Sequence, residues 1–139
     1  MREILFKAKS IQTGEWIEGY YLRDQYHIGG KDIIFYRKDS DRFTVYTNII
    51  DIETLCQFTG LYDKNGNKIW ENDIVTCQTK YGGDIGKIVF HNGKFCVLWN
   101  STYHYSRNGK CENYYDINTK NSVKGNVFDN PELLQGSVK

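Results

Sequence analysis

The amino-acid sequence predicts an all-β fold, a barrel-like arrangement of about ten short antiparallel strands. Three Asn-Gly pairs lie between runs of strand character, and such pairs favour tight hairpins because both turn residues need positive φ. The runs are rich in β-branched and aromatic residues, which suit a pleated sheet. Aromatic residues reach 15% of the chain, so the chain is expected to fold, because disordered chains are poor in them.

The composition predicts a single domain over residues 1–139, located in the cytoplasm. The length fits one domain, and no segment has the composition of a flexible linker. Lys and Arg number 18 against 17 Asp and Glu, so no overall field draws the chain to a polyanion or a membrane. No apolar run approaches the roughly 20 residues that a membrane span requires.

Four strands are expected in the N-terminal half. They cover residues 4–8, 15–21, 33–36 and 43–46, all short runs of β-branched and aromatic side chains. Gly29 and Gly30 predict a turn between the second and the third. These strands give the first half of the predicted sheet structure.

The pair Asn65-Gly66 predicts the first hairpin. A two-residue loop places Asp63 opposite Lys68, an opposite-charge pair, and Leu61 opposite Trp70. Residues 69–77 are then expected to continue as one strand.

The pair Asn92-Gly93 predicts a second hairpin with a well-defined register. A two-residue tip aligns His91 with Lys94, Phe90 with Phe95, Ile88 with Val97 and Gly86 with Trp99. The last three pairs form one apolar face. A large ring opposite a strand glycine also covers the exposed backbone of that glycine.

The pair Asn108-Gly109 predicts a third hairpin with Tyr103 opposite Tyr114. The same register sets Arg107 against Lys110, which is unfavourable. A longer loop or a shifted register is the alternative.

Helix is expected only at the end of the chain, as a single short turn. Asn130 can cap it, Pro131 suits its first position, and Glu132 lies near the positive end of its dipole. Leu133 and Leu134 follow.

Three segments carry a resemblance to a known family. Residues 57–75 read QFTGLYDKNGNKIWENDIV, residues 125–134 read GNVFDNPELL, and residues 1–8 read MREILFKA, followed by Trp16 and Gly19. These resemble the central, closing and opening motifs of the YopX family of phage and prophage proteins, although residues 79–123 match less well. The resemblance implies a phage or prophage origin and an all-β barrel-like fold. The family has no assigned active site whose residues could be located in this chain.

The acidic pair in the central motif has two interpretations. On one strand, Glu71 and Asp73 share a face, as acid/base pairs or hard-cation sites require. The family motif has glycine at Asn72 and is similar to the acidic turn of SH3-like barrels, which implies SH3-like features in the C-terminal half. In such turns the carboxylate organises backbone amides. Because Asn tolerates positive φ, the turn is expected to survive in this chain.

Neither a metal site nor a cofactor is expected from the remaining polar residues. The cysteines lack close pairs and are predicted to be buried free thiols: Cys56, Cys77, Cys96 and Cys111. The histidines show no catalytic or metal-binding spacing: His27, His91 and His104. The glycines within residues 80–87 predict a loop or β-bulge, because a phosphate cradle would open a helix.

The candidate binding segment is residues 99–115, where aromatic and basic side chains alternate. Its candidate binding residues are Trp99, Tyr103, Tyr105, Arg107, Lys110 and Tyr114. Tyr, Trp and Arg are enriched where proteins bind proteins, and the same mixture forms platforms for single-stranded nucleic acid on β-barrels. Ordinary strand packing of the tyrosines is the alternative that involves no binding.

We therefore expect a non-enzymatic accessory protein that binds a host or phage protein in the cytoplasm of the host cell. Single-stranded nucleic-acid binding is the alternative and requires Lys and Arg from several strands to converge around the tyrosines. An enzyme is the third hypothesis and requires Glu71, Asp73, a histidine or a cysteine to meet in one pocket. The oligomeric state stays open, since an exposed edge strand can pair with a second copy.

Overall fold

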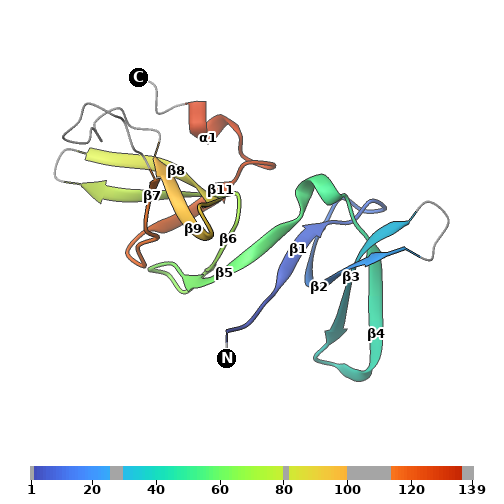
Figure 1. The fold of residues 1–139 in the computed structure, drawn as a ribbon. Coiled ribbons are helices and arrows are strands. Elements are labelled where there is room, and N and C mark those ends of the chain that lie inside the picture. Colours follow the sequence, from blue (N-terminus) through green and yellow to red (C-terminus); the bar gives the residue numbers. More distant parts are fainter. Residues whose placement is uncertain (1, 26–29, 80–81, 100–113, 136–139) are drawn as a thin grey trace. The chain divides into compact units, whose positions relative to one another are not determined.

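The computed structural model describes residues 2–25, 30–79, 82–99 and 114–135 and confirms an all-β fold (Figure 1). In chain order the strands are β1 (Phe6–Lys9), β2 (Trp16–Asp24), β3 (Lys31–Lys38), β4 (Asp41–Ile49), β5 (Cys56–Tyr62), β6 (Lys68–Trp70), β7 (Asp73–Thr79), β8 (Gly82–His91), β9 (Lys94–Trp99), β10 (Tyr114–Tyr115) and β11 (Ser122–Asn126). A 3₁₀ turn (Ile52–Thr54) precedes β5, and the helix α1 (Glu132–Gln135) is a single short turn, as expected.

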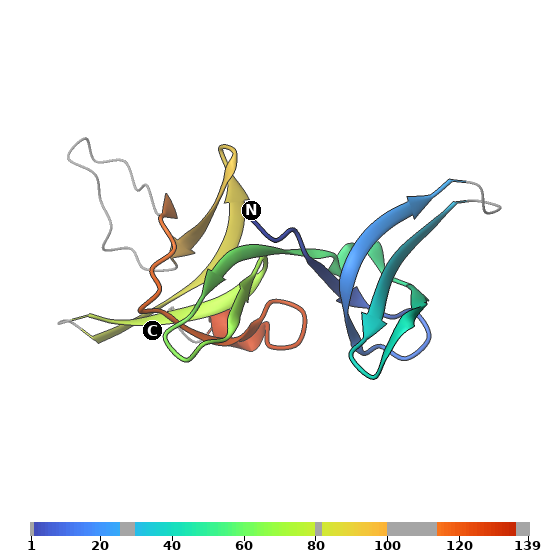
Figure 2. The same cartoon turned by 90° about the horizontal axis from the view of Figure 1, so that it is seen from below.

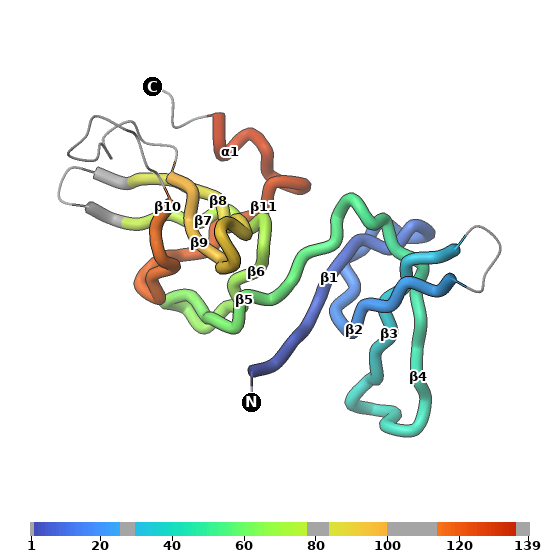
Figure 3. The backbone as a smooth tube through the Cα atoms, in the orientation of Figure 1, coloured from blue at the N-terminus to red at the C-terminus, as the bar shows by residue number. Residues whose placement is uncertain are grey.

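The chain forms two compact units, Met1–Phe58 and Thr59–Lys139. The boundary falls inside β5, which is hydrogen-bonded to β1 and also to β6. Figure 3 traces the backbone through this strand from the first unit into the second. The single domain expected over residues 1–139 stays a prediction, because a shared strand does not by itself show that the two units unfold together.

The first unit is an antiparallel sheet in the order β4-β3-β2-β1-β5 (Figure 2). An isolated bridge between Ser10 and Ile50 joins the end of β1 to the end of β4, so the sheet curls towards a barrel without closing fully. Ala8, Ile34 and Ile50 are almost completely buried on its inner side. The curl therefore decides which side of the sheet becomes the core.

The second unit contains an antiparallel sheet in the order β10-β9-β8-β7-β11, together with β6 and α1. Its core cluster consists of buried residues from β6 to β9: Ile69, Val75, Ile88, Val97 and Trp99. Val123 on β11 packs against this cluster as a partly buried side chain. The core therefore joins residues that are far apart in the sequence.

The hairpin at Asn92-Gly93 has the predicted register, and all four predicted pairs are present. Asn92 and Gly93 have φ values of 50° and 80°, as a tight turn of this type requires. Trp99 covers Gly86 so closely that a Cβ on this glycine would lie 2.9 Å from Cε3 of the indole. The predicted packing of a ring over a glycine is confirmed.

The hairpin at Asn65-Gly66 forms, but the predicted register is wrong by one residue. The amide of Asp63 donates to the carbonyl of Asn67 (2.8 Å), so Asp63 faces Asn67 and not Lys68. The amide of Gly66 donates to the carbonyl of Asp63 (3.1 Å), and Gly66 has φ of 84°. The loop thus contains three residues, with glycine supplying the left-handed position that this loop length needs.

The predicted continuous strand over residues 69–77 is also wrong, because a turn separates β6 from β7. Asn72 adopts φ of 70° at this turn, so the expected turn survives without glycine. Asp73 is buried, and its carboxylate accepts a hydrogen bond from the amide of Trp70 (2.8 Å). This contact agrees with the amide-organising role expected from the similarity to SH3-like turns. Because a turn intervenes, Glu71 and Asp73 do not share a strand face.

At the end of the chain, the carbonyl of Asn130 accepts a hydrogen bond from the amide of Leu133 in the helical turn (3.1 Å), but its side chain does not make the predicted cap. Its side-chain oxygen accepts a hydrogen bond from the amide of Asn126 (3.3 Å), which closes the loop before the helix. The third predicted hairpin lies largely outside the described residues; of the predicted pair, only Tyr114 is described, and it pairs with Leu98. No helix in the described part of the chain is both long and apolar enough to cross a membrane.

Candidate protein-binding surface

In the first unit, β2, β3 and β4 carry apolar side chains on both sides of the sheet. The side facing away from the core is called the outer face, and its apolar residues are Tyr20, Leu22, Ile33, Phe35, Val45 and Ile49. Successive residues of a strand point to opposite sides, so these positions alternate with core residues such as Ile34. The outer face is thus a second apolar side that the core of this unit does not cover.

Cross-strand pairing arranges the outer face in two adjacent rows. Tyr20 pairs with Phe35, and their ring centroids are 5.6 Å apart. Leu22 pairs with Ile33, which in turn pairs with Ile49 on the neighbouring strand. The row of Leu22, Ile33 and Ile49 is apolar across three strands, whereas the row of Tyr20 and Phe35 ends at Thr47 on β4. Because the two rows are adjacent, their apolar residues form one surface and are not scattered singly.

Four apolar side chains of the outer face are open to solvent. Tyr20 is 52% exposed, Leu22 50%, Val45 47% and Ile49 41%. Single exposed apolar side chains are ordinary on protein surfaces, whereas a contiguous apolar patch marks an interaction site. We therefore identify the outer face as the candidate functional surface.

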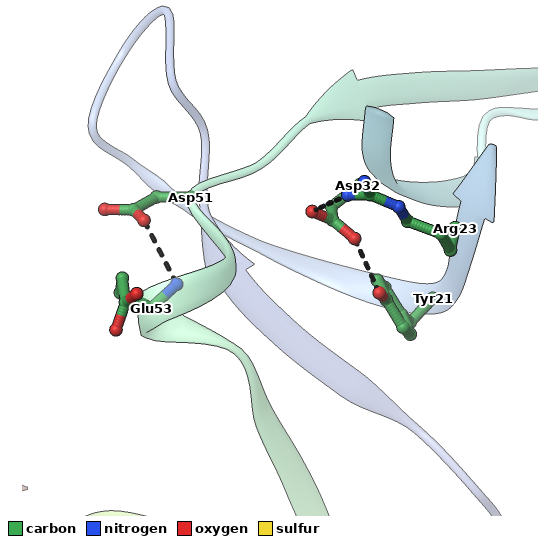
Figure 4. A network of polar contacts seen from close by, with 5 residues as sticks. All are labelled: Tyr21, Arg23, Asp32, Asp51 and Glu53. Carbon is green, nitrogen blue, oxygen red and sulfur yellow. Dashed lines mark hydrogen bonds and ion pairs between the residues drawn. The ribbon is translucent and has the colours of Figure 1, made fainter. Parts of the chain in front are cut away.

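A polar network on the opposite side of β2 and β3 fixes their register (Figure 4). The hydroxyl of Tyr21 donates to Asp32 Oδ1 (2.6 Å), and Nη1 of Arg23 donates to Asp32 Oδ2 (2.7 Å). The hydrogen bond to Asp32 raises the pKa of Tyr21, with burial adding to the effect. Because Tyr21 and Arg23 flank Leu22, this network holds Leu22 on the outer face.

The inner side also brings β2 and β3 close together. A Cβ added to Gly19 would collide with the carbonyl oxygen of Phe35 and lie 2.8 Å from Cγ2 of Ile34. Glycine at this position therefore permits the close approach of the two strands that carry Tyr20 and Phe35.

The 3₁₀ turn between β4 and β5 is capped and is hydrogen-bonded to β1. The side chain of Asp51 accepts a hydrogen bond from the amide of Glu53 (3.1 Å), as Figure 4 also shows. The amide of Lys9 donates to Thr54 Oγ1 (2.8 Å), which links the end of β1 to this turn. The cap fixes the position at which β5 begins beside β1.

The predicted binding segment is only partly within the described residues. Trp99 is 8% exposed and belongs to the core of the second unit, where its indole cannot act as an exposed platform. Tyr114 is 45% exposed, and its ring stacks on that of His91, with centroids 3.8 Å apart. The other predicted binding residues lie outside the described residues: Tyr103, Tyr105, Arg107 and Lys110.

The thiols agree with the prediction from the sequence where they are described. Among the described residues, Cys56, Cys77 and Cys96 form no disulfide, and Cys56 and Cys96 are buried while Cys77 is half-buried. Burial raises the pKa of the Cys77 and Cys96 thiols, which favours their protonated form at neutral pH. Cys111, His27 and His104 lie outside the described residues.

The outer face was missed by sequence reasoning, although the sequence contains a signal for it. Residues 33–36 are four consecutive apolar residues, and residues 20–22 are three. A strand with one solvated side alternates apolar and polar residues, whereas a strand covered on both sides reads as a continuous apolar run. Such a run on a strand with only one buried side indicates a second, uncovered apolar side.

Comparisons with known proteins agree on the fold and leave the function open. A family model described as YopX protein matches residues 5–135. The crystal structure of protein EF1440 from Enterococcus faecalis is similar with a TM-score of 0.54 and 21% sequence identity, covering 96% of this chain and 99% of that one. At this identity the likeness shows the fold alone. No curated protein matches the sequence.

Proposed function

The chain belongs to the YopX protein family, and we propose that it is a non-enzymatic accessory protein of phage or prophage origin that binds another protein in the host cytoplasm. The observation that carries this proposal is the outer face of the first unit, a contiguous apolar surface on three paired strands. Family membership supports the phage or prophage origin, because the motifs resemble those of phage proteins.

The composition of the outer face favours a protein partner. Apolar and aromatic side chains dominate the centres of protein interfaces, where charged residues are depleted. The paired rows that contain Tyr20 and Leu22 have no charged member between them. A preformed sheet surface also binds with little loss of conformational entropy, since its side chains are already ordered by cross-strand packing.

Single-stranded nucleic acid is the second candidate, and one contact favours it. Trp16 and Tyr20 lie on the same side of β2, and the ammonium groups of Lys7 and Lys9 lie 4.6 and 5.4 Å from the Trp16 ring centroid. Aromatic and basic side chains together can stack bases and hold phosphates. The aliphatic row of Leu22, Ile33 and Ile49 offers neither interaction, and this row is why protein comes first.

The test is a pull-down with the tagged chain from prophage-induced host cells, with and without nuclease. The test variant carries Tyr20→Ser and Leu22→Ser, and the control carries Leu61→Ser and Phe90→Ser, two exposed apolar residues of the second unit. A stoichiometric, nuclease-resistant protein is expected with wild type and control, and its recovery should fall about tenfold or more with the test variant. Circular dichroism confirms that each variant is folded.

Two results would contradict the proposal. Equal recovery of the protein with the test variant would place the binding site away from the outer face. Loss of all partners after nuclease treatment would favour the nucleic-acid candidate.

A further inference from the structure

The outer face has a positively charged end beside its apolar rows. On β2, Trp16 and Glu18 alternate with core residues and lie on the same side as Tyr20. On β1, Lys7 pairs with Glu18, and Lys9 pairs with Trp16. The strand pairing thus extends the outer face from apolar rows into a group of two ammonium groups, one carboxylate and an indole.

The two ammonium groups lie close to the indole of Trp16. Lys7 Nζ lies 4.6 Å and Lys9 Nζ 5.4 Å from the centroid of the Trp16 ring. A cation near an aromatic face is attracted by the ring quadrupole, and its aliphatic stem packs against the ring. Both lysines are half-buried, and both ammonium groups lie beside the same ring.

At the opposite end of the outer face the charges cancel. Asp24 pairs with Lys31 across β2 and β3. At the Trp16 end, the formal charges on β1 and β2 come from Lys7, Lys9 and Glu18, which together leave one positive charge there. The face as a whole is apolar in the middle and electropositive at one end.

We propose that the partner docks on the outer face through an acidic amphipathic segment, with its apolar side chains over Tyr20 and Leu22 and its carboxylates beside Lys7 and Lys9. This inference rests on the proposed function and specifies the chemistry of the partner. Carboxylates complement the positive end, and ion pairs at the rim of an apolar contact set orientation and specificity. Apolar contact in the middle supplies the larger share of the affinity.

The charge pattern disfavours the other occupants of this face. A second copy of the chain would present the same lysines and no excess of carboxylates, so the face does not complement itself in charge. A nucleic acid would find a positive end but no partner for the aliphatic row of Leu22, Ile33 and Ile49. An acidic polypeptide satisfies both parts of the face.

The test uses two synthetic peptides that share one pattern of Leu and Phe and differ only in having Glu or Lys at the remaining positions. Each is titrated into the full chain and followed by amide and indole NMR shifts at low and high salt. The Glu peptide should shift the Trp16 indole signal and the Tyr20 and Leu22 amides, and should bind at least about fivefold more tightly than the Lys peptide at low salt. High salt should reduce this preference.

Charge variants make the result specific. Lys9→Glu should reverse the preference between the two peptides, and Lys9→Gln, which leaves no new charge, should weaken it. Lys120→Glu is the matched control, because it makes the same charge change at an exposed lysine of the second unit. It should leave the preference unchanged.

Several outcomes would overturn the inference. Two of them concern the peptides: equal affinity for both, or no change in the NMR signals of the outer face with either. The other two are tighter binding of a single-stranded oligothymidylate at the same residues and self-association of the chain through this face without peptide. If both peptides bind equally and Tyr20→Ser with Leu22→Ser abolishes both, only the charge inference fails. If the cellular partner still binds that double variant, the proposed function fails whatever the peptides do.

Discussion

At the scale of the residue, Asp63 is a buried carboxylate that joins two distant parts of the second unit. It is 5% exposed and accepts hydrogen bonds from the amides of Asn65 (2.9 Å), Asn67 (2.8 Å) and Val123 (2.9 Å). Burial alone would raise the pKa of this carboxyl, but the hydrogen bonds from Val123, Asn67 and Asn65 outweigh burial and hold the pKa below its ordinary value. The ionised form therefore stabilises the fold.

We expect Asp63→Asn to lower the free energy of unfolding at neutral pH by about 1–3 kcal/mol, because an amide leaves buried donors without an acceptor. The folded-state pKa lies below the unfolded-state value of about 3.9. The contribution of Asp63 is therefore complete above that pH and is lost as the pH falls towards the folded-state pKa. The measurement is the midpoint of thermal unfolding against pH for both proteins.

Asp39→Asn is the control for Asp63→Asn, because Asp39 is exposed in the turn between β3 and β4. It should leave the unfolding midpoint nearly unchanged at every pH. The difference in unfolding midpoint between wild type and Asp63→Asn should shrink in acid. A difference that stays constant as the pH falls would contradict the role assigned to the ionised carboxylate.

At the scale of the element, the β8–β9 hairpin depends on the contact between Gly86 and Trp99. A Cβ on Gly86 would lie 2.8 Å from the carbonyl oxygen of Leu98, 2.8 Å from Cγ1 of Val97 and 2.9 Å from Cε3 of Trp99. Two of these groups are buried side chains of the core, which cannot move without disturbing their neighbours. The hairpin has no room for a side chain at this position.

We expect Gly86→Ala to destabilise the protein by about 1–3 kcal/mol, because a methyl group would overpack the core. Urea unfolding followed by tryptophan fluorescence measures the effect, and a changed folded-state spectrum should report displacement of Trp99. Lys87→Ala changes the adjacent position on the other side of the strand and should lower the stability by less than Gly86→Ala. Wild-type stability of Gly86→Ala would show that the two strands can separate without penalty.

At the scale of the whole molecule, the two units share β5. The first unit contains 58 residues, Met1–Phe58, and a domain of about 60 residues buries only about 60% of the surface of its unfolded chain. Such a unit is marginally stable alone. Unfolding of either unit would also remove hydrogen-bonded partners of β5, which couples the two.

We therefore expect one cooperative unfolding transition, in agreement with the single domain predicted from the sequence. Trp16 reports on the first unit, whereas Trp70 and Trp99 report on the second. Urea unfolding of wild type and of Trp16→Phe, which retains only the second-unit probes, should give the same midpoint. Two resolved transitions in calorimetry would establish two independent domains. So would different urea midpoints for wild type and Trp16→Phe that remain after correction for the changed stability of the variant.

The sequence by itself determined the all-β class, the final helical turn and the β8–β9 hairpin. These depend on local chemistry, since Asn92 and Gly93 require a two-residue turn and that turn sets every cross-strand pair after it. The turn at Asn72 was likewise expected from the tolerance of Asn for positive φ. Local backbone preference was sufficient in each of these cases.

Tertiary structure decided the features that depend on distant contacts. The register after Asp63 differs from the prediction because this carboxylate accepts amides from its own loop and from Val123, which is far along the chain. Trp99, predicted as a binding residue, became a core residue through packing against β6 to β8. The bridge between Ser10 and Ile50 curls the first sheet and sets its core side, leaving Tyr20 and Leu22 outside. A strand with two apolar sides does not encode which side is buried, because that depends on how the sheet bends.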